Sequence, residues 1–474
     1  MFDALFTTTT EYKKLSHALS GKGACALFGL PASGRAQVYA ALCRQLDKPL
    51  CIVTPGEAEA TRFAADLNTL GIPAAVFPAR DYVLRPIEGT AREYEYRRLA
   101  VLGELVGGRL RAVAVPAEAL TQFTTPKEDF CANTRTLHAG DTLLRDDLLA
   151  ALFGAGYTRR AQVDGPGQFS VRGDIVDIFA PDQKMPVRME FWGDEIDTLH
   201  TFDLTTQRRE DAIDKFYLSP AREVLFGKPA DAAEQLRAFL AKQRGKKKTA
   251  MADCMAADLD LLDGGAVPVN MDKYLVVRYP HPATVLDYFD DPILVAEEPA
   301  SIREADRATA YRRGEELKSL ILDGVLCAGL DNLYADPSYL WSKTGYYRTI
   351  CAENFARSMP DQPLKDIVNA PAHTLPAWNG EVAGLLEDLK PLCDAGYTVT
   401  LLAGTDRAAA GLARDLRDKG ILVTTDAAAA PAAGLVQVLA GHLSAGCEFP
   451  FAKYALLTGR AFGETSSQKK KRKK

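Results

Sequence analysis

Two short stretches of this sequence carry residues at the spacing of a nucleotide-binding site. In the first, Gly29 and Gly34 follow an apolar run at residues 24–28, and Arg35 and Ala36 come next. The glycines match the phosphate-binding pattern G-x-x-x-x-G-K-S/T, in which the lysine contacts the phosphates and the hydroxyl holds Mg²⁺. Arginine replaces the lysine here and alanine replaces the hydroxyl residue. Because Mg²⁺ would lose a direct ligand, we expect a degenerate loop that does not hydrolyse nucleotide.

The second stretch is PILVAEEPAS at residues 292–301, an apolar run that ends in Glu297 and Glu298. In nucleotide hydrolases an acid at a strand tip holds Mg²⁺ and a neighbouring group orients water. Many strands end in glutamate, so this pattern alone is weak. Beside the altered loop it predicts two degenerate motifs of one former nucleotide site, with no catalytic residue and no bound metal. A structural strand–loop–helix turn is our interpretation, and residual nucleotide binding is the alternative.

A third stretch, residues 156–209, has a different pattern. Its short apolar runs, Phe169–Val171, Ile175–Phe179 and Val187–Trp192, are rich in β-prone residues and separated by Gly, Pro and Asp. This composition predicts an antiparallel sheet built from hairpins. On both sides, apolar strands alternate with longer helical patterns, which indicates an α/β domain. We therefore predict a small β-rich module inserted into an α/β domain.

The whole pattern predicts an α/β fold, and the length of 474 residues indicates that it is divided into several domains. A segment rich in proline, with Pro360, Pro363 and Pro371, indicates a linker, and the basic end of the chain lacks a packing signal. The predicted units are the two parts of the α/β domain at 1–118 and 213–345, the inserted β module at 119–212, a linker at 346–374, a small α/β domain at 375–462 and a disordered basic tail at 463–474.

Composition excludes several classes of protein. The formal net charge is −5, so the body of the chain offers no general attraction for nucleic acid. The nine cysteines include no C-x-x-C pair, which indicates reduced thiols in the cytoplasm and argues against structural zinc. No apolar run is long enough to cross a bilayer, and the first residues lack a signal-peptide core. We expect a cytoplasmic monomer that does not bind membranes.

Three motifs occur in order within the β-rich stretch: GQFSVRGDIVDIF, PVRMEFWGDEID and FDLTTQR. Together with the altered loop, the EEP strand end, and Phe462-Gly463 before the basic run Lys469–Lys474, they make the sequence similar to the N-terminal region of the bacterial transcription-repair coupling factors. The first domains of that family resemble the nucleotide-excision-repair protein UvrB, and the resemblance covers nearly the whole chain. It implies a UvrB-like, RecA-like α/β domain with a degenerate P-loop.

The resemblance implies that the inserted module contacts UvrA. The contact residues carried over by motif are Arg172 in VRGD, Arg188 in PVRMEF, and Trp192, where the family has a phenylalanine. Arginine and tryptophan are enriched among residues that dominate interface energies. The alternative is that the two arginines are ordinary exposed sheet residues and that Trp192 caps the core of the module.

In this family the basic run leads into an RNA-polymerase-interacting domain and a DNA translocase motor that uses ATP and Mg²⁺. We expect a fragment without them, which has no cofactor and would reach RNA polymerase and DNA only through the missing domains. The predicted function is a non-catalytic recruitment module that docks UvrA in transcription-coupled nucleotide excision repair. One alternative is a nucleotide-dependent, helicase-like ATPase acting on damaged DNA; another is a scaffold that shields the motor.

Overall fold

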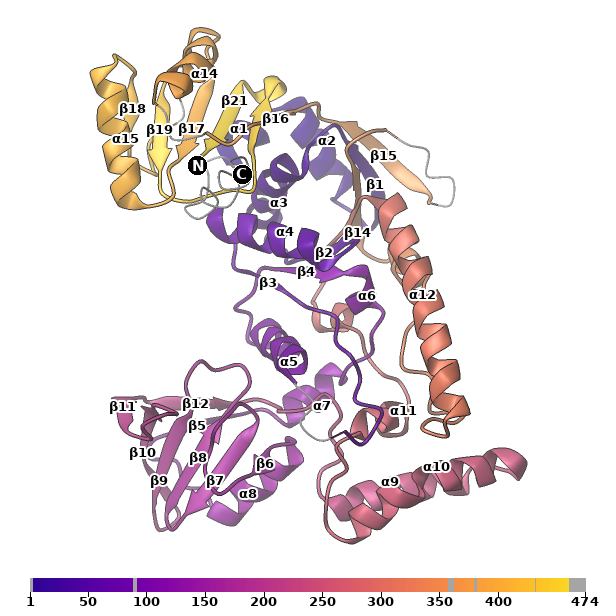
Figure 1. Ribbon diagram of the computed structural model, residues 1–474. Coiled ribbons are helices and arrows are strands. Elements are labelled where there is room, and N and C mark those ends of the chain that lie inside the picture. Colours follow the sequence, from indigo (N-terminus) through magenta and orange to yellow (C-terminus); the bar gives the residue numbers. More distant parts are fainter. Residues whose placement is uncertain (1–2, 88–91, 357–361, 379–381, 431, 460–474) are drawn as a thin grey trace, which may run out of the picture.

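The computed structural model describes residues 3–87, 92–356, 362–378, 382–430 and 432–459. It contains three larger sheets, each the centre of one unit, with the inserted β module and the last α/β unit at opposite ends of the molecule (Figure 1). The mixed α/β fold with several sheets is confirmed. Within the described ranges, no helix combines the length and the apolar character needed to cross a membrane.

The central unit is built on a seven-stranded parallel sheet with the order β15-β1-β14-β13-β2-β4-β3. Four of its strands, including β1 and β13, are buried along their whole length, as is typical of parallel strands covered by helices on both faces. The strands are β1 (Gly23–Phe28), β2 (Leu50–Thr54), β3 (Ala74–Val76), β4 (Ala112–Pro116), β13 (Ile293–Glu297), β14 (Arg348–Glu353) and β15 (Leu364–Asn369).

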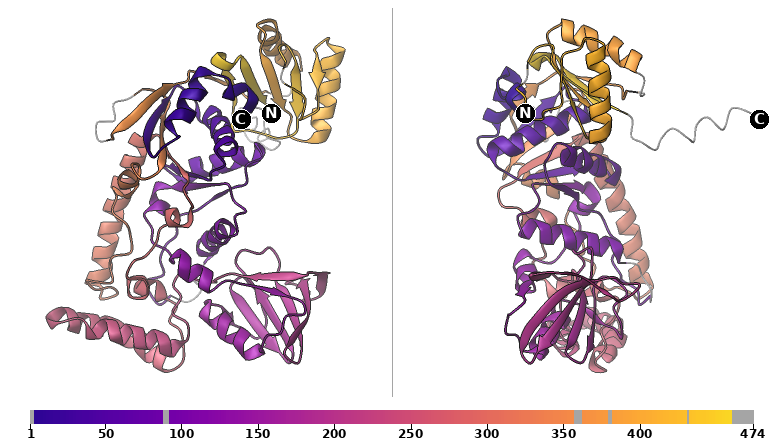
Figure 2. Two further views of the ribbon diagram at one scale, coloured as in Figure 1. Left: turned by 180° about the vertical axis from the view of Figure 1, so that it is seen from behind. Right: turned by 90° about the vertical axis from the view of Figure 1, so that its left-hand side faces the viewer.

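Helices cover the two faces of this sheet and form two separate cores. One core joins alternate sheet residues such as Leu27 and Ile52 to the helices α1 (Asp3–Thr7), α2 (Thr10–Ala18), α3 (Ala32–Leu46) and α4 (Glu57–Thr69). The other joins the intervening sheet residues to α5 (Glu93–Val106), α6 (Ala117–Leu120), η2 (Val285–Tyr288), α13 (Tyr339–Lys343) and the start of α12 (Pro299–Leu322). Helix α12 then runs along the side of the central unit toward α11 (Figure 2).

A third core lies at the far end of α12. It packs residues after β12 against α9 (Pro229–Ala241), α10 (Gly245–Asp263), η1 (Met271–Tyr274) and α11 (Leu275–Arg278). Helices α9 and α10 pack against each other beside the inserted module (Figure 1).

The inserted module contains a six-stranded sheet, β11-β10-β9-β8-β7-β6, in which every pairing except that of β6 with β7 is antiparallel. The three predicted strands are confirmed within two residues. The module contains β5 (Arg135–His138), α8 (Arg145–Gly154), β6 (Thr158–Arg159), β7 (Gln168–Arg172), β8 (Ile175–Phe179), β9 (Val187–Trp192), β10 (Glu195–Phe202), β11 (Arg209–Ala212) and β12 (Lys215–Leu218).

The last unit has a sheet in the order β16-β20-β21-β17-β19-β18, with parallel strands around β17 and an antiparallel edge. Its elements are β16 (His373–Leu375), α14 (Val382–Asp394), β17 (Thr398–Leu402), α15 (Asp406–Asp418), β18 (Val423–Thr424), β19 (Val436–Leu439), β20 (Gly446–Phe449), η3 (Pro450–Ala452) and β21 (Tyr454–Thr458). It shares a core with the first helices: the rings of Phe6 and Phe449 lie edge to face at 4.9 Å.

A buried ionic network joins the inserted module to the central unit. Glu223, just after β12, accepts hydrogen bonds from Arg98 of α5 at 2.6 and 3.1 Å and forms an ion pair with Arg80 at 3.1 Å. Arg80 also donates two bonds to Asp272 of η1, at 2.7 and 3.0 Å. Because each of these buried charges has an opposite charge beside it, the network holds segments from four parts of the chain together.

Helix α7 (Lys127–Ala132) is joined to this region by a separate ion pair, in which Arg278 of α11 lies 2.5 Å from Asp129.

The predicted linker at 346–374 is wrong. Residues 348–353 and 364–369 are the strands β14 and β15, which flank β1, and residues 373–375 begin the last sheet. The prolines favoured a linker over a strand. Pro363, however, lies just before an edge strand, where a missing N–H breaks no hydrogen bond of the sheet. The predicted module bounds of 119 and 212 are also too early, since β5 starts at 135 and pairs with β12 up to 218. The tail at 463–474, and the end of the last unit at 462, lie outside the described residues.

Candidate functional site

The altered phosphate loop is shorter than the sequence pattern indicates. Helix α3 begins at Ala32 with Pro31 as its N-cap residue, so Gly34, Arg35 and Ala36 lie in its first turns and not in a loop. Gly29, with φ of 86°, makes the sharp turn out of β1. A short turn of this kind has fewer free backbone N–H groups to surround a phosphate than the longer loop of nucleotide hydrolases.

Residues that follow β15 pack directly on this turn. The N–H of Ala370 donates to the carbonyl of Phe28 at 2.9 Å, and that of Ala372 donates to the carbonyl of Gly29 at 3.0 Å. A Cβ atom at Gly29 would lie 3.0 Å from the side-chain oxygen of Asn369 and 3.1 Å from the backbone of Pro371. Glycine is therefore required at Gly29 by both the backbone angle and the close approach.

The structure brings the two predicted nucleotide motifs together. Arg35 Nε lies 3.0 Å from Glu297 Oε2, and Arg35 Nη2 donates to Glu298 Oε1 at 2.9 Å. The hydroxyl of Tyr39, one turn further along α3, donates to Glu297 Oε1 at 2.5 Å. Arg35, at the position that the phosphate-binding pattern gives to lysine, is thus occupied by the two acids at the end of β13.

Burial controls the ionisation of this cluster. Burial raises the pKa of the Glu297 carboxyl, although the neighbouring Arg35 and the Tyr39 hydroxyl oppose the shift. Burial would lower the pKa of Arg35, but the charge of Glu297 and further acidic groups outweighs it, so the net shift is upward. The guanidinium therefore keeps its charge and acts as the internal counterion of the acids.

The last unit covers the start of α3. A Cβ atom at Gly34 would lie 2.9 Å from Cys447 Sγ and 3.4 Å from the ring of Phe449. The hydroxyl of Ser33 donates to the carbonyl of Gly446 at 3.4 Å. Strand β20 therefore packs closely against the first turn of α3.

The three residues predicted to contact UvrA lie on one face of the six-stranded sheet. Side chains alternate between faces along a strand, so Arg188, Glu190 and Trp192 of β9 project to the same side. Glu190 is paired with Ile175, and Ile175 with Arg172, which places Arg172 on that side as well. We call this side the polar face; the other side packs on α8 and β12.

The two arginines of the polar face are held by one buried carboxylate. Asp177 of β8 has 1% of its side chain exposed and accepts bonds from Arg188 Nε at 2.7 Å and Nη2 at 2.9 Å. Its Oδ2 also accepts a bond from Arg172 Nη2 at 2.7 Å. The sequence analysis missed Asp177, although an acidic residue inside the apolar run IVDIF was a visible sign of a buried charge pair.

The exposures of the three predicted residues differ widely. Trp192 is 82% exposed, whereas the adjacent Phe191 is buried in the module core. The alternative in which Trp192 caps that core is therefore wrong. The side chain of Arg172 is 49% exposed and that of Arg188 only 11% exposed. Arg172 and Trp192 are available to a partner, while Arg188 is largely internal.

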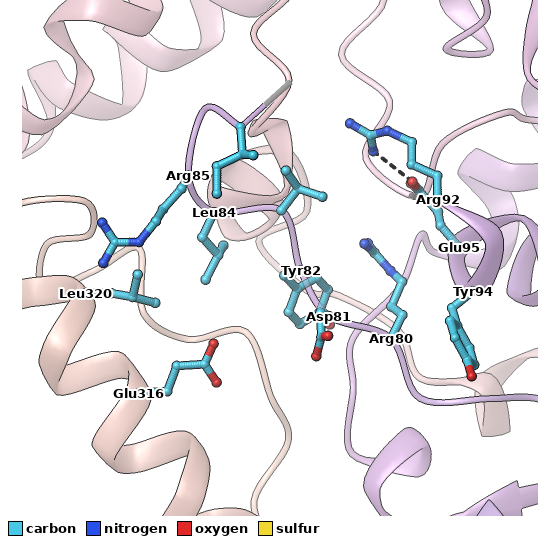
Figure 3. A pocket seen from close by; sticks show the side chains of 12 residues that line it. Arg80, Asp81, Tyr82, Leu84, Arg85, Arg92, Tyr94, Glu95, Glu316 and Leu320 are labelled. Carbon is cyan, nitrogen blue, oxygen red and sulfur yellow. Dashed lines mark hydrogen bonds and ion pairs between the residues drawn. The ribbon is translucent and has the colours of Figure 1, made fainter. Parts of the chain in front are cut away.

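A separate cavity of about 370 Å³ lies between the loop after β3 and helix α12 (Figure 3). Its lining includes three arginines, but Arg80 is paired with Asp272, Arg92 with Glu95 at 2.9 Å, and Arg85 with Asp323. The arginines are occupied by acids of the chain itself. We therefore assign no anion site here.

The comparisons with known proteins identify the class of the inserted module first. Residues 136–224 match the family model described as the UvrB interaction domain. This range spans β5 to the segment just after β12, and it contains Arg172, Asp177, Arg188 and Trp192.

Over almost its full length, the chain is similar to transcription-repair-coupling factors. It is 25% identical to that of Bacillus subtilis (strain 168) over 461 residues, which covers 94% of this chain and 39% of the relative. It is also 25% identical to that of Staphylococcus haemolyticus over 459 residues and 24% identical to that of Staphylococcus aureus (strain MRSA252) over 455 residues. The predicted resemblance is confirmed, and the chain spans about two fifths of the length of these relatives.

Proposed function

We propose that this chain is a recruitment module of transcription-coupled nucleotide excision repair, and that it docks UvrA through the polar face of its inserted module. The observation that carries the proposal is the match of residues 136–224 to the UvrB interaction domain. The similarity to transcription-repair-coupling factors supports the pathway. RNA polymerase and DNA are the partners, and ATP with Mg²⁺ the motor cofactors, that we propose for a transcription-repair-coupling factor containing such a module.

The chemistry of the polar face supports an interface anchored by Trp192 and Arg172. An indole that is 82% exposed contributes nothing to the core and can fill a pocket on a partner. A half-exposed guanidinium on the same face, that of Arg172, supplies directional bonds to a carboxylate or carbonyl. The combination of an aromatic anchor and an arginine is typical of residues that carry most of an interface's energy.

A binding titration of purified UvrA with this chain tests the proposal. We expect Trp192→Ala and Arg172→Ala each to weaken the complex. Tyr311→Ala and Arg237→Ala are the matched controls, because both residues are exposed on helices outside the module, at 75% for Tyr311 and 52% for the side chain of Arg237. Equal binding by the Trp192 and Arg172 variants and by these controls would refute the assignment of the site.

We further propose that Gly29–Ala36 with Glu297 and Glu298 is a degenerate nucleotide site with a structural role. The ion pair of Arg35 with Glu297, and the cover of β20 over the helix start, support this. The ATPase alternative predicts nucleotide turnover by the chain. Isothermal titration with MgATP is expected to show no binding, and turnover that Arg35→Ala abolishes would favour the ATPase.

A further inference from the structure

We propose that Asp177 is a positioning residue of the docking surface, which orients the guanidinium group of Arg172 toward a carboxylate of the partner, on the same sheet face as the indole of Trp192. This inference rests on the proposed function. It also assigns Arg188 a supporting role beneath the surface instead of a direct contact.

The bonds of Arg188 show why it belongs to the support. It donates two bonds to Asp177 and a third, from Nη1, to the carbonyl of Gln207 at 3.2 Å. Its guanidinium carbon lies 4.7 Å from the centre of the Phe202 ring. With 11% of its side chain exposed, it has little surface left for a partner, and its charge instead balances the buried carboxylate.

Arg172 is in the opposite situation. Only its Nη2 bonds to Asp177, and half of its side chain remains in solvent. Glu190, two residues from Trp192 on the same face, forms an ion pair with Arg209 of β11, so its charge is already balanced on the side away from Arg172. The group of Arg172, Asp177 and Arg188 carries one net positive charge, and the free edge of Arg172 presents it. A carboxylate is the group that best matches that edge.

Fixing the side chain of Arg172 before the partner arrives lowers the conformational-entropy cost of binding. A long side chain that becomes fixed in an interface loses about 0.5–1.5 kcal/mol of conformational freedom. The bond from Asp177 removes part of this loss before the partner arrives. Removing Asp177 should then weaken binding by between about twofold and tenfold.

The test is a binding titration with UvrA that uses a variant with the same net charge as the unmodified chain. Asp177→Leu with Arg188→Met removes one negative and one positive charge, leaves Arg172 as the net positive charge, and replaces a buried pair by apolar groups, which a fold commonly tolerates. We expect this double variant to bind UvrA between about twofold and tenfold more weakly than the unmodified chain. Arg172→Ala should have a smaller effect in the double variant than in the unmodified chain, because the two changes act through one group.

Asp182→Asn is the matched control, since Asp182 is a partly buried aspartate of the same module. Its carboxylate accepts a hydrogen bond from the Ser219 hydroxyl at 2.7 Å and does not bond to Arg172 or Arg188. This substitution should leave UvrA binding unchanged. Full affinity of the folded Asp177→Leu/Arg188→Met variant, or an unchanged effect of Arg172→Ala in it, would overturn this inference and leave the proposed function standing. Absence of UvrA binding by the unmodified chain would instead overturn the proposed function. If the double variant does not fold, Asp177→Asn takes its place. The effect of Arg172→Ala on UvrA affinity is then compared between the Asp177→Asn background and the unmodified chain.

Discussion

Arg35 Nε lies 3.0 Å from Glu297 Oε2, and the two side chains are 3% and 2% exposed. The residues come from the start of α3 and the end of β13, the two places where nucleotide hydrolases hold phosphate and Mg²⁺. Here the cation and the acid contact each other directly. This pair links two elements that are separated by more than half of the chain.

Substituting Arg35 by alanine is expected to destabilise the fold. Removal of Arg35 leaves Glu297 buried without its ion-pair partner, which typically costs about 3–5 kcal/mol in the free energy of unfolding. Urea denaturation of Arg35→Ala measures this loss. The matched control is Arg237→Ala, which breaks an exposed pair with Asp263 and should change stability by less than about 1 kcal/mol. A stable Arg35→Ala protein with altered MgATP binding would contradict the structural role.

Trp192 should affect binding without affecting stability. Because its ring lies in solvent, Trp192→Ala is expected to change the free energy of unfolding by no more than about 0.5 kcal/mol. If the indole is an interface anchor, the same change costs about 2 kcal/mol or more in UvrA binding, roughly a thirtyfold loss of affinity. Phe191→Ala should do the reverse and destabilise the module, since Phe191 is buried in its core. Thermal melting and a binding titration of both variants check the contrast.

Gly34 should report on the packing of β20 over α3. Alanine is normally the better helix former by about 1 kcal/mol, but its Cβ would lie 2.9 Å from Cys447 Sγ. We expect Gly34→Ala to destabilise the protein by about 1–3 kcal/mol, as overpacking does. In a Cys447→Ala background the clash is relieved, so the same substitution should cost less or become stabilising. An equal effect of Gly34→Ala in both backgrounds, measured by urea denaturation, would contradict the close approach.

The carboxyl of Asp306 on α12 should make stability depend on pH. Burial raises its pKa from 3.8 to about 6, with Arg313 and Arg303 opposing the shift. In the unfolded chain the group ionises first, so the free energy of unfolding should fall as pH rises from about 4 to about 6 and level off above that. Asp306→Asn should show a smaller fall and be more stable at neutral pH, whereas the exposed Glu304→Gln should behave like the unmodified chain. Urea midpoints across this pH range test the sign.

Much of the inserted module could be predicted from sequence, because strand periodicity is local. Alternation along VRMEFW places Arg188, Glu190 and Trp192 on one face whatever the rest of the chain does. The hairpin glycines Gly173 and Gly193, with positive φ, mark turns that a short window of sequence reveals. The exposure of each face, however, depended on which side α8 and β12 cover.

The amino-acid sequence by itself determined the residue types at the two predicted nucleotide motifs and the shared face of Arg188 and Trp192. Only the tertiary structure decided that Arg35 meets Glu297, that β14 and β15 flank β1, that β20 covers the start of α3, and that Asp177 holds both arginines. The reason is physical. Side-chain alternation is set by neighbouring residues, whereas burial and charge pairing depend on segments that are distant in the chain and meet only when the sheets assemble.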